Sequence, residues 1–232
     1  MVNMHGACGR QECECVALDF EGRDGDHQGG TQTWHFAENY VQELISKVTQ
    51  MPPDVRWHFI GGLQSNKAKE LVRCCGPLLA AIETVDSTKL ADKIDAAVAS
   101  LPEALRHARA QPLEVLIQVN TSPWEGTKNG CDAADVVGLA DHIRAAFPNV
   151  KLAGLMTIGA PGEPFCFTAL CDCRDALARH LKVQPSTLRL SMGMSGDFEE
   201  AVAAGSDSVR VGSRPSPTVI HVVSLIAAHS GS

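Results

Sequence analysis

The stretch SMGMSGDFEEAVAAGSDSVRVGSR, residues 191–214, contains one local pattern twice. A short apolar strand is expected at 188–192, and it continues into the small-residue loop at 191–195. A second strand is expected at 208–211, and it continues into Gly212 and Ser213. Loops of small residues at the carboxyl ends of two strands can direct several backbone N–H groups at one anion, so the repeated pattern suits a phosphate group.

A helix is expected between these two strands, over residues 197–204. Ser195 is the expected N-cap, acidic residues fill the first turn, and Gly205 ends the helix. The stretch therefore predicts a strand–helix–strand unit in which the two strands are parallel and adjacent.

The rest of the chain alternates strand-like apolar runs with helical periodicity. Strands separated by single helices indicate parallel βαβ units. With Cys15–Leu18 as a candidate eighth strand, the pattern predicts a single-domain (β/α)₈ barrel of the TIM type, and a doubly wound parallel sheet is the alternative. The other expected strands are Trp34–Phe36, Val55–Ile60, Ala81–Val85, Glu114–Val119 and Leu152–Ile158.

The two ends fit this pattern less well than the middle. Residues 1–33 are polar and rich in glycine, so an irregular segment is expected there. The barrel is expected over residues 34–214. The tail at 215–232 begins with two prolines and continues with an apolar segment for which a helix is expected.

Composition excludes several classes of protein. The net charge of −7 and the absence of a Lys/Arg run argue against a nucleic-acid surface. No apolar stretch reaches the roughly 18 residues that a membrane span needs, and the cytoplasm is the expected location. The nine cysteines are expected to be reduced thiols, and a metal site on Cys8, Cys13 and Cys15 is the less favoured alternative, so no metal is predicted.

The chemistry of a barrel lies at the carboxyl ends of its strands, and phosphate groups often bind the loops after the last two strands. Ordinary tight turns are the alternative reading of each loop taken alone. In Val209-Arg210-Val211 the valines should face the outer helices, which sends Arg210 inward. There it either pairs with a barrel carboxylate or donates to a ligand. His58, within an apolar strand, is expected as a core histidine.

Several ordered motifs resemble the pyridoxal phosphate (PLP) homeostasis proteins, which are close to the N-terminal barrel of alanine racemases. The resemblance covers the chain from about residue 34 to residue 213. Its motifs are HFAENYVQEL (35–44), WHFIGGLQSNKAKEL (57–71), ETVDS (83–87), VLIQVNTS (115–122), GLMTIG (154–159) and SMGMSGDFEEAVAAGSDSVRVGS (191–213).

The resemblance implies a PLP site at the mouth of the barrel. It implies that the phosphate lies on the two loops, that Arg210 faces the pyridine nitrogen, and that Asn39 and Met156 line the pocket of the ring. The residues implied for the phosphate and its loops are Ser191, Met192, Ser195, Gly212 and Ser213.

One family feature is absent. The family holds PLP as a Schiff base on a lysine that ends the first strand, but this chain has no lysine before Lys47. Lys47 follows the ENYVQE stretch and is expected away from the mouth. Lys128 is expected to be a loop charge, and the nearest counterpart of the first strand, CVALDF at 15–20, contains no lysine.

The resemblance therefore implies a monomeric, non-catalytic PLP-binding protein that supplies PLP-dependent apoenzymes, with binding that is non-covalent or impaired. An alanine-racemase-like enzyme is one alternative, although such enzymes use a tyrosine from a second domain and Tyr40 is the sole tyrosine here. A cofactor-free barrel acting as an interaction scaffold is the other alternative.

Overall fold

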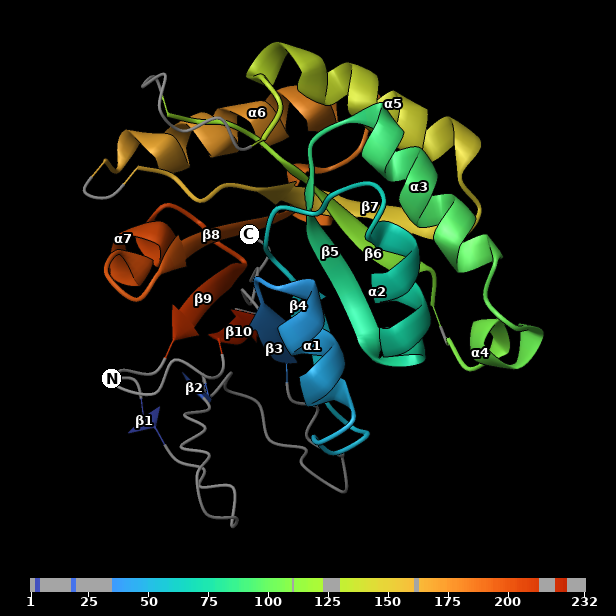
Figure 1. Cartoon of the computed structure of the whole chain (residues 1–232). Helices are drawn as coiled ribbons and strands as arrows, with labels where there is room; N and C mark the ends of the chain where they lie inside the picture. The colour runs from blue at the N-terminus through green and yellow to red at the C-terminus, as the bar shows by residue number, and fades with distance from the viewer. Residues whose placement is uncertain are drawn as a thin grey trace, which may run out of the picture.

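The strands of the middle of the chain close into a barrel. The computed structural model describes residues 3–4, 18–19, 35–109, 111–122, 130–160, 163–212 and 220–224. Seven strands follow one another in parallel around the barrel, and an eighth closes it (Figure 1). The seven are β3 (His35–Glu38), β4 (Arg56–Phe59), β5 (Leu79–Val85), β6 (Leu113–Gln118), β7 (Val150–Met156), β8 (Arg189–Met194) and β9 (Ser208–Gly212).

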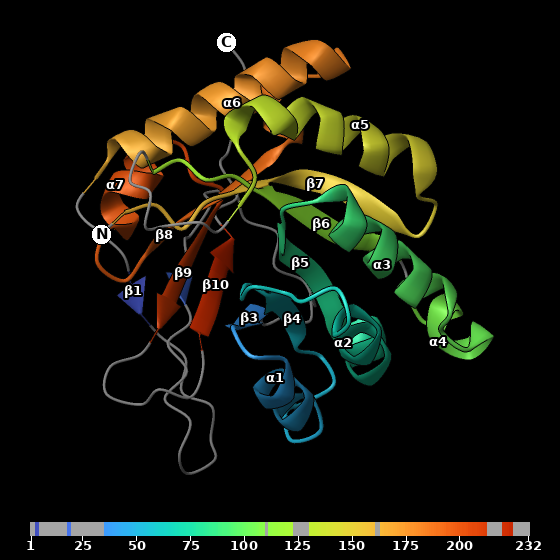
Figure 2. The same cartoon turned by 45° about the horizontal axis from the view of Figure 1, so that its top comes forward.

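The closing strand is β10 (Ile220–Ser224), and it runs antiparallel to both of its neighbours. Ile220 is in register with Ala37 of β3 and with Gly212 of β9. Figure 2 shows β9 and β10 side by side with their arrows in opposite directions. The predicted barrel is confirmed, but the expectation of a helix in the tail is wrong at these residues.

The predicted first strand is also wrong in its position. Of the first 34 residues, the structure describes β1 (Asn3–Met4) and β2 (Leu18–Asp19), which pair antiparallel with each other in a separate two-stranded sheet. Neither pairs with the barrel, and the place between β9 and β3 belongs to β10. A local apolar run cannot reveal which distant segment will occupy an open place in a sheet.

Helices cover the outside of the barrel, as expected for parallel strands joined by crossovers (Figure 1). Ser87 caps the start of α3, because its Oγ accepts from the backbone N–H of Leu90. The helices are α1 (Val41–Val48), α2 (Ala68–Cys75), α3 (Thr88–Ala99), α4 (Glu103–His107), α5 (Val136–Ala146), α6 (Phe165–Leu181) and α7 (Phe198–Ala203).

Period-two alternation divides the buried side chains into two cores. Trp57 and Phe59 of β4 are fully buried in the main core between strands and helices. A smaller cluster of Ala81, Leu116, Ala153 and Met156 belongs to other positions of β5, β6 and β7. The alternating positions of the strands therefore supply the side chains of the barrel interior, where the polar residues described below also lie.

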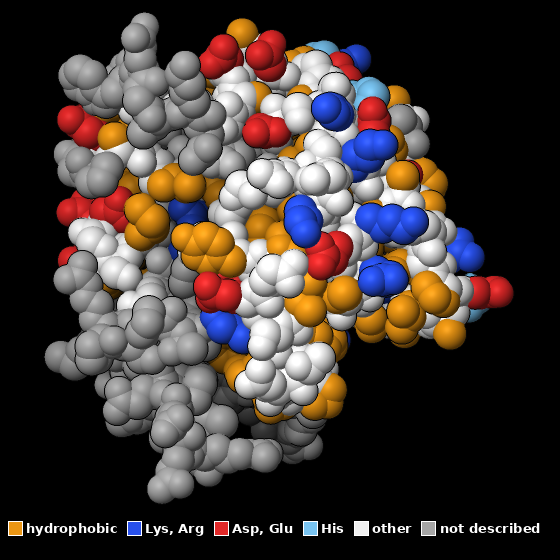
Figure 3. All heavy atoms as spheres, viewed as in Figure 1, with side chains coloured by type: hydrophobic (Ala, Val, Ile, Leu, Met, Phe, Trp, Pro, Cys, Tyr) orange, Lys and Arg blue, Asp and Glu red, His pale blue; other side chains and the backbone are white. Residues whose placement is uncertain are grey.

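Within the part of the chain that is described, no helix combines the length and the apolar character that a membrane crossing requires. On the face shown in Figure 3, acidic and basic side chains are interspersed among hydrophobic ones over the described residues. Six described cysteines are free thiols, whereas Cys8, Cys13 and Cys15 lie outside the described residues.

Candidate functional site at the mouth of the barrel

The turn after β8 meets the end of β9 at the mouth of the barrel. Strands β8 and β9 are adjacent and parallel, as the sequence predicts. The backbone N–H of Gly212 donates to Ser195 Oγ over 3.1 Å, and Ser195 is exposed. Ser195 and Gly212 thus form one small polar rim. Ser213, predicted beside them, lies outside the described residues.

The helix after this rim begins differently from the prediction. Its N-cap is Asp197 rather than Ser195. Asp197 Oδ1 accepts from the backbone N–H of Met194 over 2.6 Å, which fixes the turn that carries Ser195. The hydroxyl of Ser195 is bonded to Gly212 instead, so a long-range contact prevails over the local capping pattern.

Two of the predicted phosphate residues have side chains away from this rim. Ser191 is 1% exposed, and its Oγ donates to Glu83 Oε2 over 2.6 Å. Met192 is fully buried in the main core, on the side of β8 that faces the helices. Alternation along β8 sends the side chain of Ser191 into the barrel and that of Met192 away from it, and their part in binding a phosphate stays a prediction.

Arg210 lies inside the barrel, as the alternation of β9 predicts. Its side chain is 3% exposed. One Nη donates to Ser191 Oγ and the other to the backbone carbonyl of Thr157, each over 2.7 Å. Burial lowers the pKa of Arg210, and the nearby carboxylates of Glu83 and Asp197 oppose that shift. A buried guanidinium held in this way is rigid and directed.

The carboxylate that balances Arg210 belongs to a buried chain of hydrogen bonds across the interior. Glu83 is 1% exposed, and its Oε1 lies 2.6 Å from His58 Nδ1. His58 Nε2 lies 2.8 Å from His35 Nδ1. The chain therefore runs from His35 on β3 through His58, Glu83 and Ser191 to Arg210 on β9.

Glu83 and His35, two members of this hydrogen-bond chain, also have shifted pKa values. Burial alone would raise the pKa of Glu83, but the hydrogen bond and charge of His58, the charge of Arg210 and the hydrogen bond from Ser191 hold it at about 2. Burial, followed by the charges of His58, Arg189 and Arg56, lowers the pKa of His35 to about 4. Glu83 is therefore ionised at neutral pH, and His58 Nδ1 is the donor in their hydrogen bond.

Asn39 is exposed to solvent, whereas Met156 is buried. Asn39 is exposed at the end of β3, where its backbone N–H donates to Glu38 Oε1 over 2.7 Å. Met156 is fully buried at the end of β7, in the small cluster with Leu116. Their roles beside a ligand ring stay predictions.

Two described lysines near the ends of β3 and β4 are paired with carboxylates. Lys47 Nζ contacts Glu38 Oε2 and lies 3.5 Å from Glu43 Oε2. Glu38 alternates with Ala37 along β3, so this pair lies on the helix side of the strand. Lys67 Nζ pairs with Glu70 of α2 over 2.8 Å. Lys128 lies outside the described residues.

Three interior residues were missed by the sequence reasoning. Glu83, His35 and Gln118 are polar residues in apolar strands, and no function was given to them. Glu83 and Gln118 are 1% and 4% exposed. The available signal was a polar residue at an inward position of an otherwise apolar strand, since such a residue needs a buried partner.

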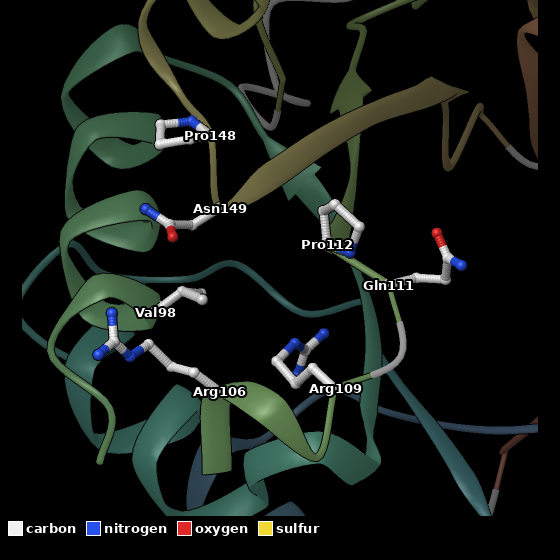
Figure 4. Close-up of a pocket in the computed structure, with 7 residues that line it drawn as sticks. All are labelled: Val98, Arg106, Arg109, Gln111, Pro112, Pro148 and Asn149. Carbon is white, nitrogen blue, oxygen red and sulfur yellow. The ribbon is translucent and has the colours of Figure 1, made fainter. Parts of the chain in front are cut away.

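A pocket of about 200 Å³ lies at the end of the barrel opposite the mouth (Figure 4). It is lined by α4 and by the segments that lead into β6 and β7, including Arg106, Arg109, Pro112 and Pro148. The guanidinium of Arg109 donates to the carbonyls of Gly76 and Leu79, over 2.8 and 2.9 Å, which is a structural role. Barrel chemistry lies at the other face, so the mouth is the candidate site.

No group of three or more metal-ligating side chains occurs among the described residues.

A family model described as the alanine racemase N-terminal domain matches residues 28–214. The PLP homeostasis protein of Schizosaccharomyces pombe is 41% identical over 201 residues, which are 81% of this chain and 78% of that protein. The bovine one is 40% identical over 189 residues, and the chain spans 66% of its length and matches it over 77% of its own.

Solved structures of related proteins also resemble this chain. PipY of Synechococcus elongatus, in a structure with PLP bound, is 30% identical with a TM-score of 0.61, over 78% of this chain and 80% of that one. An alanine racemase of Clostridium difficile is 12% identical with a TM-score of 0.52, over 81% of this chain and 47% of that one, and shares the fold alone. The chain belongs to the alanine racemase N-terminal-domain family, among the pyridoxal phosphate homeostasis proteins.

Proposed function

We propose that this chain binds pyridoxal 5′-phosphate at the mouth of its barrel without a covalent bond, and that it keeps the cofactor available rather than catalysing a reaction. The observation that carries the proposal is the contact of Ser195 with Gly212 at the ends of adjacent strands, with Arg210 two residues deeper on β9. This arrangement offers a polar rim for a phosphate and a buried cation for a ring.

The residues present fit the cofactor at these two points. Ser195 and Gly212 would bind the phosphate, and Arg210 would donate toward the pyridine nitrogen. An arginine at that nitrogen leaves it unprotonated, which weakens the cofactor as an electron sink. When bound, the cofactor supplies an aldehyde that reacts with amines.

The non-covalent part of the proposal rests on the lysines. Lys47 and Lys67, the described lysines nearest in sequence to the ends of β3 and β4, are paired with the carboxylates of Glu38 and Glu70. The relatives are named as homeostasis proteins, which supports a carrier rather than an enzyme. Supply of PLP to apoenzymes, a monomeric state and a cytoplasmic location belong to the same proposal, and the free thiols fit a reducing compartment.

Isothermal titration against PLP and against a small phosphate ester tests the proposal. Wild type should bind both, with PLP bound more tightly, and borohydride should trap no covalent adduct. Ser195→Ala should weaken both ligands by a similar factor, of roughly tenfold for one lost charge-assisted hydrogen bond. Arg210→Lys keeps the buried charge but loses the directed guanidinium, so it should weaken PLP more than the ester.

The alternatives give different results in the same experiment. A wild-type protein that binds neither ligand favours the cofactor-free scaffold. Racemisation of an amino acid in the presence of PLP, abolished by Arg210→Lys, favours the enzyme. A trapped lysine adduct contradicts the non-covalent mode of binding.

A further inference from the structure

A small pocket of about 60 Å³ lies at the mouth, where β6 and β7 end. Its lining includes Gln118 and Thr157. The chain returns to the end of β6, where the backbone N–H of Asn120 donates to the carbonyl of Cys131 and that of Cys131 donates to the carbonyl of Gln118, each over 2.9 Å. Gly130 permits this return, because its φ is +102° and an added Cβ would lie 2.8 Å from the Asn120 nitrogen. The pocket wall is therefore held by the backbone.

Gln118 is the buried polar residue of this pocket whose side chain has no partner among the described residues. It is 4% exposed, and within the described part of the chain its side-chain amide makes no hydrogen bond. The neighbouring polar groups are already paired. Thr157 Oγ lies 2.8 Å from Thr121 Oγ and accepts from the N–H of Gly159, and Asn120 Oδ1 accepts from the N–H of Ser122. Gln118 is not among the described residues whose polar atoms are sealed off without a partner, so its amide opens onto the pocket, where a hydrogen-bonding group from outside the chain can reach it.

The position of this amide relative to Arg210 indicates which group that is. Thr157 links the pocket to Arg210, because it lines the pocket and its backbone carbonyl accepts a hydrogen bond from Arg210. Strand β6 lies three places from β9 in the order of the barrel, so Gln118 is across the mouth from the rim of Ser195 and Gly212. With the ring nitrogen at Arg210 and the phosphate at this rim, the edge of the ring opposite the phosphate carries the 2-methyl and the 3-hydroxyl.

Of these two substituents, only the hydroxyl forms hydrogen bonds. We propose that Gln118 is a specificity-determining residue of the ligand site, whose side-chain amide binds the 3-oxygen of a hydroxylated pyridine phosphate. The inference rests on the proposed function. It adds a third point of recognition, on the wall of the barrel opposite the phosphate.

The experiment compares PLP with 3-deoxypyridoxal 5′-phosphate by isothermal titration, using wild type and Gln118→Met. Methionine keeps the length of the side chain and removes the amide. Wild type should prefer PLP by roughly 10- to 100-fold, as expected for one hydrogen bond to a charged oxygen. Gln118→Met should weaken PLP by that factor and leave the affinity for the deoxy compound unchanged.

Gln118→Met should melt at or above the temperature of wild type, because the native amide has no partner to lose. Should methionine not be accommodated, Gln118→Leu gives the same comparison. Equal preference for PLP in wild type and in the folded variant overturns the inference while leaving the proposed function intact. Failure of wild type to bind either compound overturns both.

Discussion

Glu83 and Arg210 are joined through a single hydroxyl in the middle of the barrel. Ser191 Oγ donates to Glu83 Oε2 over 2.6 Å and accepts from Arg210 Nη1 over 2.7 Å. Both charged side chains are at least 97% buried. The barrel therefore contains an indirect ion pair between β5 and β9, and the residue that bridges it was predicted from the sequence to bind phosphate.

Replacing Glu83 by glutamine should strongly destabilise the fold, because it removes the buried carboxylate that is linked to the Arg210 charge through Ser191. Loss of one partner of a buried pair costs about 3 kcal/mol or more, which for a chain of this length lowers the melting temperature by roughly 6–12 °C. Thermal unfolding by circular dichroism measures this. Ser191→Ala keeps both charges and should cost less. Equal and small effects of the two variants would contradict the indirect ion pair.

The pKa of His35 predicts an acid-sensitive stability. Its ordinary value of 6.5 is lowered to about 4 in the folded chain. The unfolded chain therefore takes up a proton first, and stability is lost as the pH falls from 6.5 towards 4. His35→Gln should remove roughly 1–3 kcal/mol of that loss, discounted for partial exposure of the ring. Urea unfolding at pH 7 and pH 4.5 measures the difference, and His107→Gln, at an exposed helical position, is the control.

Gly61 and Gly62 offer a matched pair of adjacent glycines. A Cβ on Gly61 would lie 1.8 Å from the carbonyl oxygen of Asn39, whereas a Cβ on Gly62 meets nothing within 4 Å. Gly61→Ala should therefore push apart the loops after β3 and β4 and cost several kcal/mol, beyond the ordinary effect of a mutation. Gly62→Ala should be nearly neutral. Melting temperatures of the two variants decide the matter, and equal values would contradict the close approach.

Lys47→Met tests the place of the nearest candidate lysine. Lys47 holds the buried carboxylate of Glu38 on the helix side of β3. The variant should lose stability, by on the order of 1–3 kcal/mol for an unpaired buried group, yet bind PLP as wild type does. Titration and borohydride trapping measure this. A specific loss of PLP in a variant that is otherwise as stable as wild type would mean that Lys47 reaches the mouth.

The parallel strands could be predicted from the sequence because each carries a local signal. The seven apolar runs fall within about two residues of the observed strands, and the inward direction of Arg210 follows from the two flanking valines. Alternation is a property of a few consecutive residues. It needs no knowledge of distant parts of the chain.

The remaining features depend on long-range partners. The resemblance implies that Ser191 binds the phosphate, and no local pattern indicates that its hydroxyl is bonded to Glu83, which is 108 positions away. The closing strand β10 lies in an apolar segment that a helix fits as well, and its two neighbours are remote in sequence. Neither relationship is encoded within a short window of residues.

The antiparallel closing strand has a consequence for how the chain is made. Synthesis proceeds from β3 to β9 first, and throughout that time both of these strands are open edges with unpaired backbone groups. The sheet becomes a closed ring when residues 220–224 emerge. Until then the nascent chain exposes two unpaired strand edges that can bind other chains, so β10, the last of the described strands, also protects the newly made barrel from aggregation.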